Sequence, residues 1–106
     1  MRLELGRFHN QYIEVTGEFM KLATTNNCCN LLFRNIMHEG VEITDHVWVS
    51  MKNVRNKNKV NEIKLNKHVV YKMRGKVYIY KKRSKESKGM VYDFGIKSVR
   101  IELMEV

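Results

Sequence analysis

The sequence contains no proline and only two cysteines. Without proline, the breaks between secondary-structure elements have to be located from glycine, asparagine and charge clusters. The cysteines, Cys28 and Cys29, are neighbours in the chain, a spacing that disfavours a disulfide, and no second cysteine pair supplies the spacing of a zinc site. We therefore expect free thiols in a reducing compartment, and neither a metal nor another cofactor.

Signals for membrane insertion or secretion are also missing. No apolar run approaches the roughly 20 residues that a helix needs to span a bilayer. The first residues, MRLELGRFHN, lack the apolar centre of a secretory signal. We therefore expect a cytoplasmic protein that does not bind membranes. Its length of 106 residues suits one domain, which we place over residues 1–106.

Acidic residues are scarce in one part of the chain. Residues 52–89 carry 14 of the 20 Lys and Arg residues and two acids, a net charge of +12, whereas the rest of the chain has a net charge of −3. A one-sided distribution of this kind is the electrostatic footprint of a protein that binds a polyanion. The alternative is a lysine-rich surface that is merely solvated.

Apolar residues alternate with polar ones along several stretches, and no long segment has the 3.6-residue period of a helix. The pattern predicts strands over residues 12–22, 31–37, 46–51 and 69–80, and one or two more within 90–106. It predicts loops or turns over residues 23–30, 38–45 and 81–89, and a short helix or ordered loop over 52–67. The chain is therefore expected to be mostly β-structure.

Successive side chains on a strand point to opposite faces, so the residues at every second position share one face, which we call their parity. Side chains of one parity on each strand are expected to point into a shared core. After Phe19 this parity slips by one residue, which predicts a β-bulge, and Gly17 makes such a kink easier. The predicted core consists of Ile13, Val15, Phe19, Val47, Val49, Val77, Ile79, Phe94, Ile96, Val99 and Ile101. Tyr71, Met73, Tyr92 and Leu103 have the same inward parity.

Five strands with their longest connection between the third and the fourth resemble the OB-fold, a five-stranded Greek-key barrel. We therefore predict an all-β (mostly) OB-like barrel, with one short helix between strands three and four. The resemblance to OB-fold proteins implies that single-stranded nucleic acid crosses strands two and three, between loops at residues 23–30 and 81–89. An SH3-like barrel is the alternative, because strand order cannot be read from a sequence.

Two segments support a narrower resemblance. The stretch ITDHVWVSM, followed later by YDFGIKSVRIELMEV, is similar to a pattern in small uncharacterised proteins carried by phages and mobile elements of low-GC bacteria. The shared pattern is an Asp-His-aromatic strand and a later Asp-aromatic-x-aliphatic strand. This resemblance implies a genomic setting rather than a biochemistry.

The stretch YKMRGKVYIY, residues 71–80, places three cations and two tyrosines on its exposed parity. Single-stranded nucleic acid needs cations along its phosphates and flat rings on which unpaired bases stack. The alternative is an exposed strand that lysines protect against edge pairing. The predicted nucleic-acid-binding residues are Arg34, Trp48, Lys72, Arg74, Lys76, Tyr78, Tyr80, Lys81, Lys82, Arg83, Lys85 and Lys88. For Trp48, a place in the core is an equal alternative.

The sequence offers little that is typical of a catalytic site. The chain has no glycine-rich phosphate loop and no HExxH motif. Asp45 and His46 are neighbours and so point to opposite faces of a strand, which argues against a directly coupled pair. We therefore predict a non-catalytic binder of single-stranded DNA or RNA with little sequence preference. The alternative is a small phage or mobile-element module that docks on an acidic surface of a host protein.

Overall fold

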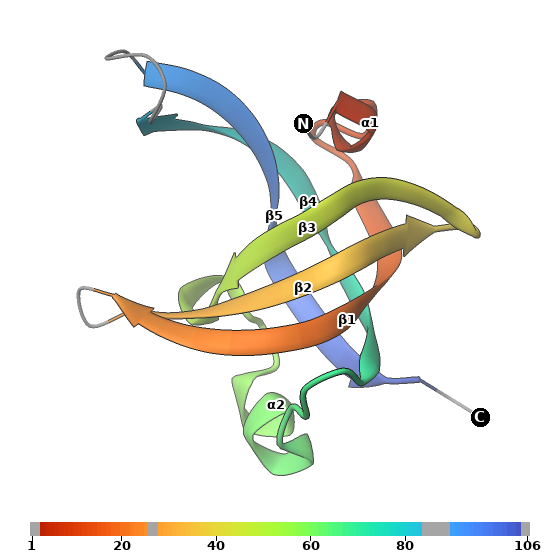
Figure 1. Cartoon of the computed structure of the whole chain (residues 1–106), viewed down its shortest axis with the longest axis vertical. Coiled ribbons are helices and arrows are strands. Elements are labelled where there is room, and N and C mark those ends of the chain that lie inside the picture. The colour runs from red at the N-terminus through yellow and green to blue at the C-terminus, as the bar shows by residue number, and fades with distance from the viewer. Residues whose placement is uncertain (1–2, 26–27, 84–89, 105–106) are drawn as a thin grey trace.

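The computed structural model of the protein describes residues 3–25, 28–83 and 90–104 (Figure 1). Its strands are β1 (Tyr12–Thr25), β2 (Cys28–His38), β3 (Val41–Ser50), β4 (Val70–Arg83) and β5 (Met90–Leu103). A 3-10 turn, η1 (Met51–Asn53), and a short helix, α2 (Lys57–Ile63), lie between β3 and β4, and α1 (Leu3–Gly6) precedes β1. The prediction of a mostly β chain with a short helix before the fourth strand is confirmed.

The strands form one sheet in the order β3-β2-β1-β4-β5, and neighbouring strands are antiparallel. The two outer strands of this order, β3 and β5, also contact each other, so the sheet curls round on itself (Figure 1). This order and closure are consistent with an OB-like barrel. The connection from η1 to α2 runs along β5, where Val54 forms a parallel bridge with Val99.

Most of the predicted core is buried. Its buried members are Ile13, Val15, Phe19, Val47, Val49, Val77, Ile96, Val99 and Ile101, together with Tyr71 and Met73. The bulge is confirmed as well, since Phe19 pairs with Phe33 while Lys21 pairs with Leu32, which leaves Met20 as the extra residue on β1.

Three residues of inward parity are exposed, and the prediction was wrong for them. Ile79 is 43% exposed, Tyr92 is 64% exposed, and Leu103 is 52% exposed, while Phe94 is only partly buried. The cause is that β4 and β5 run on past the barrel as a two-stranded ribbon, whose inner face is only partly covered (Figure 1). Leu103 is the last residue of β5, where the sheet ends.

The strands are longer than the alternation of apolar residues predicted. β1 and β2 extend into the predicted loop 23–30, and β3 begins at Val41, inside the predicted turn 38–45. β4 continues to Arg83, so Lys81, Lys82 and Arg83 belong to a strand and not to the loop 81–89. The apolar pattern stops earlier because both faces of a protruding hairpin meet water, where polar residues are tolerated.

A helix that the sequence analysis did not predict, α1, covers one end of the barrel (Figure 1). Its Leu5 is completely buried, and Asn10, which follows the helix, donates its backbone N–H to the carbonyl of Val77 at 2.9 Å. At the other end, α2 buries Val60 against the core. None of the helices within the described residues combines the length and the apolar composition that a membrane-spanning helix needs.

Candidate nucleic-acid interface

The outer face of β4 carries the predicted row of cations and tyrosines. Tyr71, Met73 and Val77 are completely buried, so the residues between them point outward. That places Lys72, Arg74, Lys76, Tyr78 and Tyr80 on one face, as the sequence predicted.

The neighbouring strand adds two cations to this row. Lys76 pairs with Lys97 of β5, and Arg74 pairs with Arg100. Lys97 and Arg100 were not among the site residues predicted from the sequence. Because Ile101 was predicted to point inward, alternation alone would have placed its neighbour Arg100 on the outer face. The pairing of Arg100 with Arg74 of β4, however, depends on a bulge in β5 between Lys97 and Arg100. We call the residues Arg74, Lys76, Lys97 and Arg100 the cation quartet.

Two aromatic rings lie next to the quartet. The ring centroids of Tyr78 and Tyr80 are 5.6 Å apart, with an angle of 36° between the planes. Both rings lie over Gly95, because a Cβ atom at that position would be 3.2 Å from Cε1 of each ring. Lys97 holds its Nζ 5.2 Å from the centroid of Tyr78, within the range of a cation–π contact. Glycine at position 95 therefore lets the two rings pack closely against the strand. We call Tyr78 and Tyr80 the tyrosine pair.

Acidic groups balance part of the charge at the other end of the row. Nζ of Lys72 is 3.7 Å from a carboxylate oxygen of Glu102, and Glu14 of β1 lies opposite Arg74. Lys76, in contrast, pairs with Tyr12 of β1 and Lys97 of β5, so its row contains no acid. The positive charge is therefore concentrated beside the tyrosine pair rather than at Lys72.

Arg34 and Trp48 belong to a different face, on the outside of β1, β2 and β3. Trp48 is 40% exposed, which removes the alternative of a core residue, and Nζ of Lys21 lies 5.8 Å from its ring centroid. In the strand order, β1 lies between β4 and the two strands, β2 and β3, that carry Arg34 and Trp48. The structure thus divides the predicted site into two groups.

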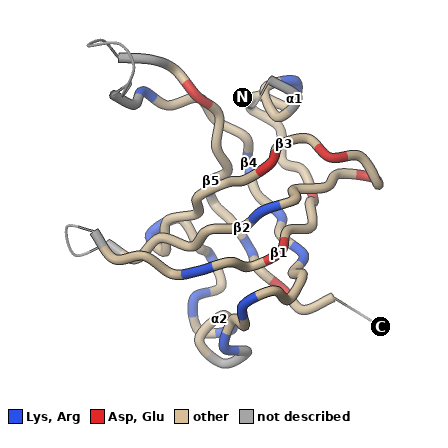
Figure 2. The backbone as a smooth tube through the Cα atoms, viewed as in Figure 1, with Lys and Arg blue, Asp and Glu red and all other residues tan. Residues whose placement is uncertain are grey.

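The charge of Arg34 is balanced by an acid on β1. Nη2 of Arg34 donates to Oε2 of Glu18 at 2.8 Å, and Nδ1 of His68 is 2.8 Å from the same oxygen. The hydrogen bond from His68 and the one from Arg34 hold the pKa of Glu18 below its ordinary value of 4.5. Acidic positions also gather along β3, while basic ones surround α2 (Figure 2).

The basic hairpin at the end of the ribbon is only partly described. Lys81 lies on the inner face of the ribbon, with its Nζ 5.8 Å from the ring centroid of Tyr92, and so points away from the tyrosine pair. Lys82 and Arg83 are in β4, but their side chains lie outside what the structure describes. Lys85 and Lys88 lie outside the described residues altogether.

The expectation for Asp45 and His46 was wrong. Nδ1 of His46 is 3.1 Å from Oδ1 of Asp45, and the same oxygen accepts the backbone N–H of His46 at 3.0 Å. Both side chains are exposed, and the short Asp45 side chain bends back along the strand instead of standing perpendicular to it. The interaction with His46 lowers the pKa of Asp45. Among the residues that the structure describes, no three His, Cys, Asp or Glu side chains gather as metal ligands.

Comparison with known proteins adds no assignment to this geometry. No protein-family model matches the chain, and no curated protein shows significant similarity to it.

Proposed function

We propose that the protein binds single-stranded nucleic acid on the outer face of β4 and β5, without catalysis and with little sequence preference. The observation that carries the proposal is the pairing of Lys76 with Lys97 and of Arg74 with Arg100. Like charges directly opposite each other on a sheet destabilise it by about 0.2–1 kcal/mol per pair. A polyanion that lies along these two pairs would offset the repulsion, above all at Lys76 and Lys97, whose row contains no acid.

The tyrosine pair supports a single strand over a duplex as the ligand. Bases of a single strand are free to stack on aromatic rings, and each stack contributes about 1–3 kcal/mol. A duplex offers phosphates but keeps its base faces inside the helix. Rings at Tyr78 and Tyr80, next to the cations, therefore suit a strand whose phosphates lie on the quartet and whose bases reach the ribbon.

The outer face of β2 and β3, where OB-fold proteins bind their ligands, is the second location to consider. Trp48 and Lys21 are present there, but Glu18 pairs with Arg34, and Glu42 and Asp45 are exposed on β3. This distribution of charge favours the β4–β5 face for a polyanion.

A competition titration tests the proposal. Fluorescently labelled dT and rU oligomers are titrated with protein and then displaced by unlabelled single strands, duplexes of equal length, or poly-glutamate. We expect the single strands to compete best. Equal competition by poly-glutamate would contradict the proposal and support docking on an acidic protein surface.

The single tryptophan of the chain locates the ligand in the same samples. Because Trp48 is not on the β4–β5 face, its intrinsic fluorescence should change little when unlabelled dT oligomers bind. Strong quenching of Trp48 would place the strand on the face of β1, β2 and β3 instead.

A further inference from the structure

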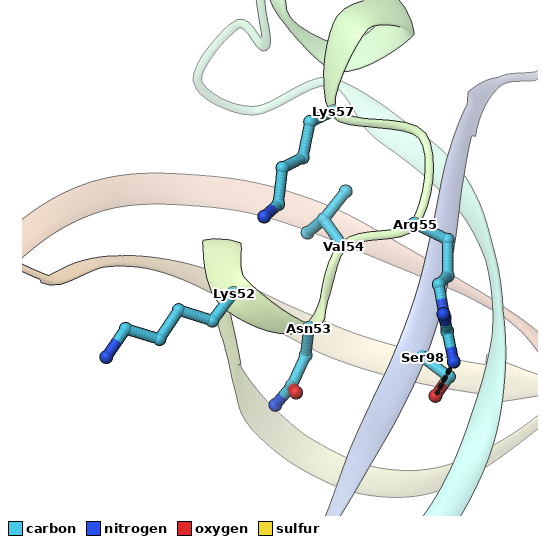
Figure 3. A pocket seen from close by; sticks show the side chains of 6 residues that line it. All are labelled: Lys52, Asn53, Val54, Arg55, Lys57 and Ser98. Carbon is cyan, nitrogen blue, oxygen red and sulfur yellow. Dashed lines mark hydrogen bonds between the residues drawn. The ribbon is translucent and has the colours of Figure 1, made fainter.

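A cavity of about 420 Å³ lies beside β5, where the connection from η1 to α2 passes the strand (Figure 3). Its lining consists of Lys52, Asn53, Val54, Arg55, Lys57 and Ser98. Three of these residues are cations and none is an acid. We call this cavity the η1–α2 pocket.

Hydrogen bonds join the main chain that forms the pocket to β5. The backbone N–H of Arg55 donates to the carbonyl of Val99 at 2.7 Å. The side chain of Asn56 continues this pairing, since it accepts the N–H of Ile101 at 3.0 Å and donates to its carbonyl at 2.7 Å. Val54, between the cations, is almost completely buried. The wall is therefore in place before any ligand arrives, which lowers the entropy cost of binding.

One cation is held in position by a hydroxyl group. Nη2 of Arg55 donates to Oγ of Ser98 at 3.2 Å, as the dashed line in Figure 3 shows. Ser98 has a backbone φ of 54°, a left-handed conformation at the β5 bulge. Because Oγ accepts from Arg55, the hydroxyl hydrogen of Ser98 remains available to donate to a ligand.

The donors around the pocket suit a doubly charged oxyanion. Lys52 and Lys57 lie on one side of Val54 and Arg55 on the other (Figure 3). Among the side chains that line the pocket, every polar atom except the Asn53 oxygen and Ser98 Oγ is only a donor. A phosphate monoester carries about −1.5 to −2 charges and three acceptor oxygens. A carboxylate, with one charge and two oxygens, would leave more of these donors without a partner.

We propose that the η1–α2 pocket binds a phosphate group. The proposal rests on this pocket alone and does not require the nucleic-acid function. Two sources offer the same chemistry: a free phosphate compound, or the terminal phosphate of a strand on the neighbouring β4–β5 face. The volume lies within the range of about 300–1,000 Å³ that is typical of small-ligand sites, so either source fits.

Inorganic pyrophosphate is the probe for the first measurement. In a two-dimensional NMR titration at low ionic strength, we expect saturable shifts of the backbone amides of Asn53, Arg55 and Ser98. The combined variant Lys52→Gln, Arg55→Gln and Lys57→Gln should bind pyrophosphate at least about ten-fold more weakly, since hydrogen bonds to charged groups are lost. The control Lys59→Gln, Lys64→Gln and Lys67→Gln has the same net charge and should bind within about two-fold of the parent.

A second variant keeps the test independent of folding. Lys57 is exposed at the first position of α2, where an acid is tolerated, so Lys57→Glu should fold normally and lose pyrophosphate binding. Shifts that never saturate, or equal affinities of the parent and the pocket variants, would overturn the proposal.

Two oligomers then separate the sources. If a strand end is the ligand, a dT oligomer with a terminal phosphate should bind more tightly than its hydroxyl counterpart, and the pocket variant should abolish the difference. Equal affinities of the two oligomers, with pyrophosphate still bound, support a free phosphate compound as the ligand. Pyrophosphate binding without any oligomer binding would leave this pocket supported while contradicting the nucleic-acid function.

Discussion

Lys76 on β4 lies directly opposite Lys97 on β5, and the next outward pair along the strands joins Arg74 to Arg100. A sheet selected for stability alone would alternate the signs of these charges, as it does where Lys72 lies opposite Glu102. The proposed nucleic-acid function would account for the contrast between the Lys76–Lys97 pair and the Lys72–Glu102 pair of the same two strands. Functional sites commonly reduce stability in this way.

Replacing one member of the quartet should separate stability from binding. In Lys76→Thr the repulsion with Lys97 disappears, so we expect an unfolding free energy that is equal or higher by about 0.2–1 kcal/mol. Affinity for dT oligomers should fall, and the slope of log K against log salt should become shallower by about 0.7. The control Lys67→Thr removes an exposed charge from the loop before β4 and should leave binding nearly unchanged. Weaker folding with unchanged binding would assign Lys76 to the fold.

The tyrosine pair should contribute stacking energy and little charge dependence. Tyr78→Ala and Tyr80→Ala are each expected to weaken oligomer binding by about 1–3 kcal/mol without changing the salt slope. Tyr92→Ala is the matched control, because Tyr92 is exposed on the opposite face of the same ribbon. Equal losses in all three variants, measured by fluorescence titration, would argue against a stacking role for the pair.

Two inward-facing residues of the β4–β5 strand pair should differ in their effect on folding, because one is buried in the barrel and the other lies on the ribbon. Ile101 is completely buried, so Ile101→Ala should lower the unfolding free energy by about 2–5 kcal/mol. Ile79 has the same parity but is 43% exposed on the ribbon, and Ile79→Ala should cost much less. Urea denaturation of both variants measures the difference. Similar losses would mean that the inner face of the ribbon is covered in solution.

Glu18 should make stability depend on pH in the acidic range. Its pKa in the folded protein lies below 4.5, so the unfolded chain takes up the proton more readily. The stabilisation is therefore fully present above pH 4.5 and is lost as the pH falls through the lowered pKa. Glu18→Gln should be less stable than the parent at neutral pH, and the difference should shrink in acid. Denaturation at a series of pH values tests this, with Glu42→Gln, an exposed acid on β3, as the control.

Alternation along strands predicted the fold class and most of the core, because parity is a local property of the chain. The same rule placed Ile79 inside, since parity identifies the face of a strand but not what covers that face. The bulge at Met20 could be predicted because the apolar residues change there from odd positions, up to Phe19, to even positions, Met20 and Leu22. Leu5 in α1 was missed, because four helical residues are too short to show a period.

The residues of the candidate site on β4 could be predicted from the sequence, but their neighbours on β5 could not. Lys76, Tyr78 and Tyr80 follow from the parity of one strand. The pairing of Arg74 with Arg100 requires the register of β4 and β5, which the bulge in β5 shifts. The assignment of Arg34 and Trp48 to the same surface depended on strand order, and sequence patterns do not contain that information.

The salt dependence of oligomer binding tests the central claim most directly. If Arg74, Lys76, Lys97 and Arg100 each neutralise one phosphate, log K for a dT oligomer should fall against log salt with a slope of about −3, from ~0.7 per contact. The slope should approach zero as members of the quartet are replaced together. Absence of binding at low salt, or a slope near zero for the parent protein, would contradict the account.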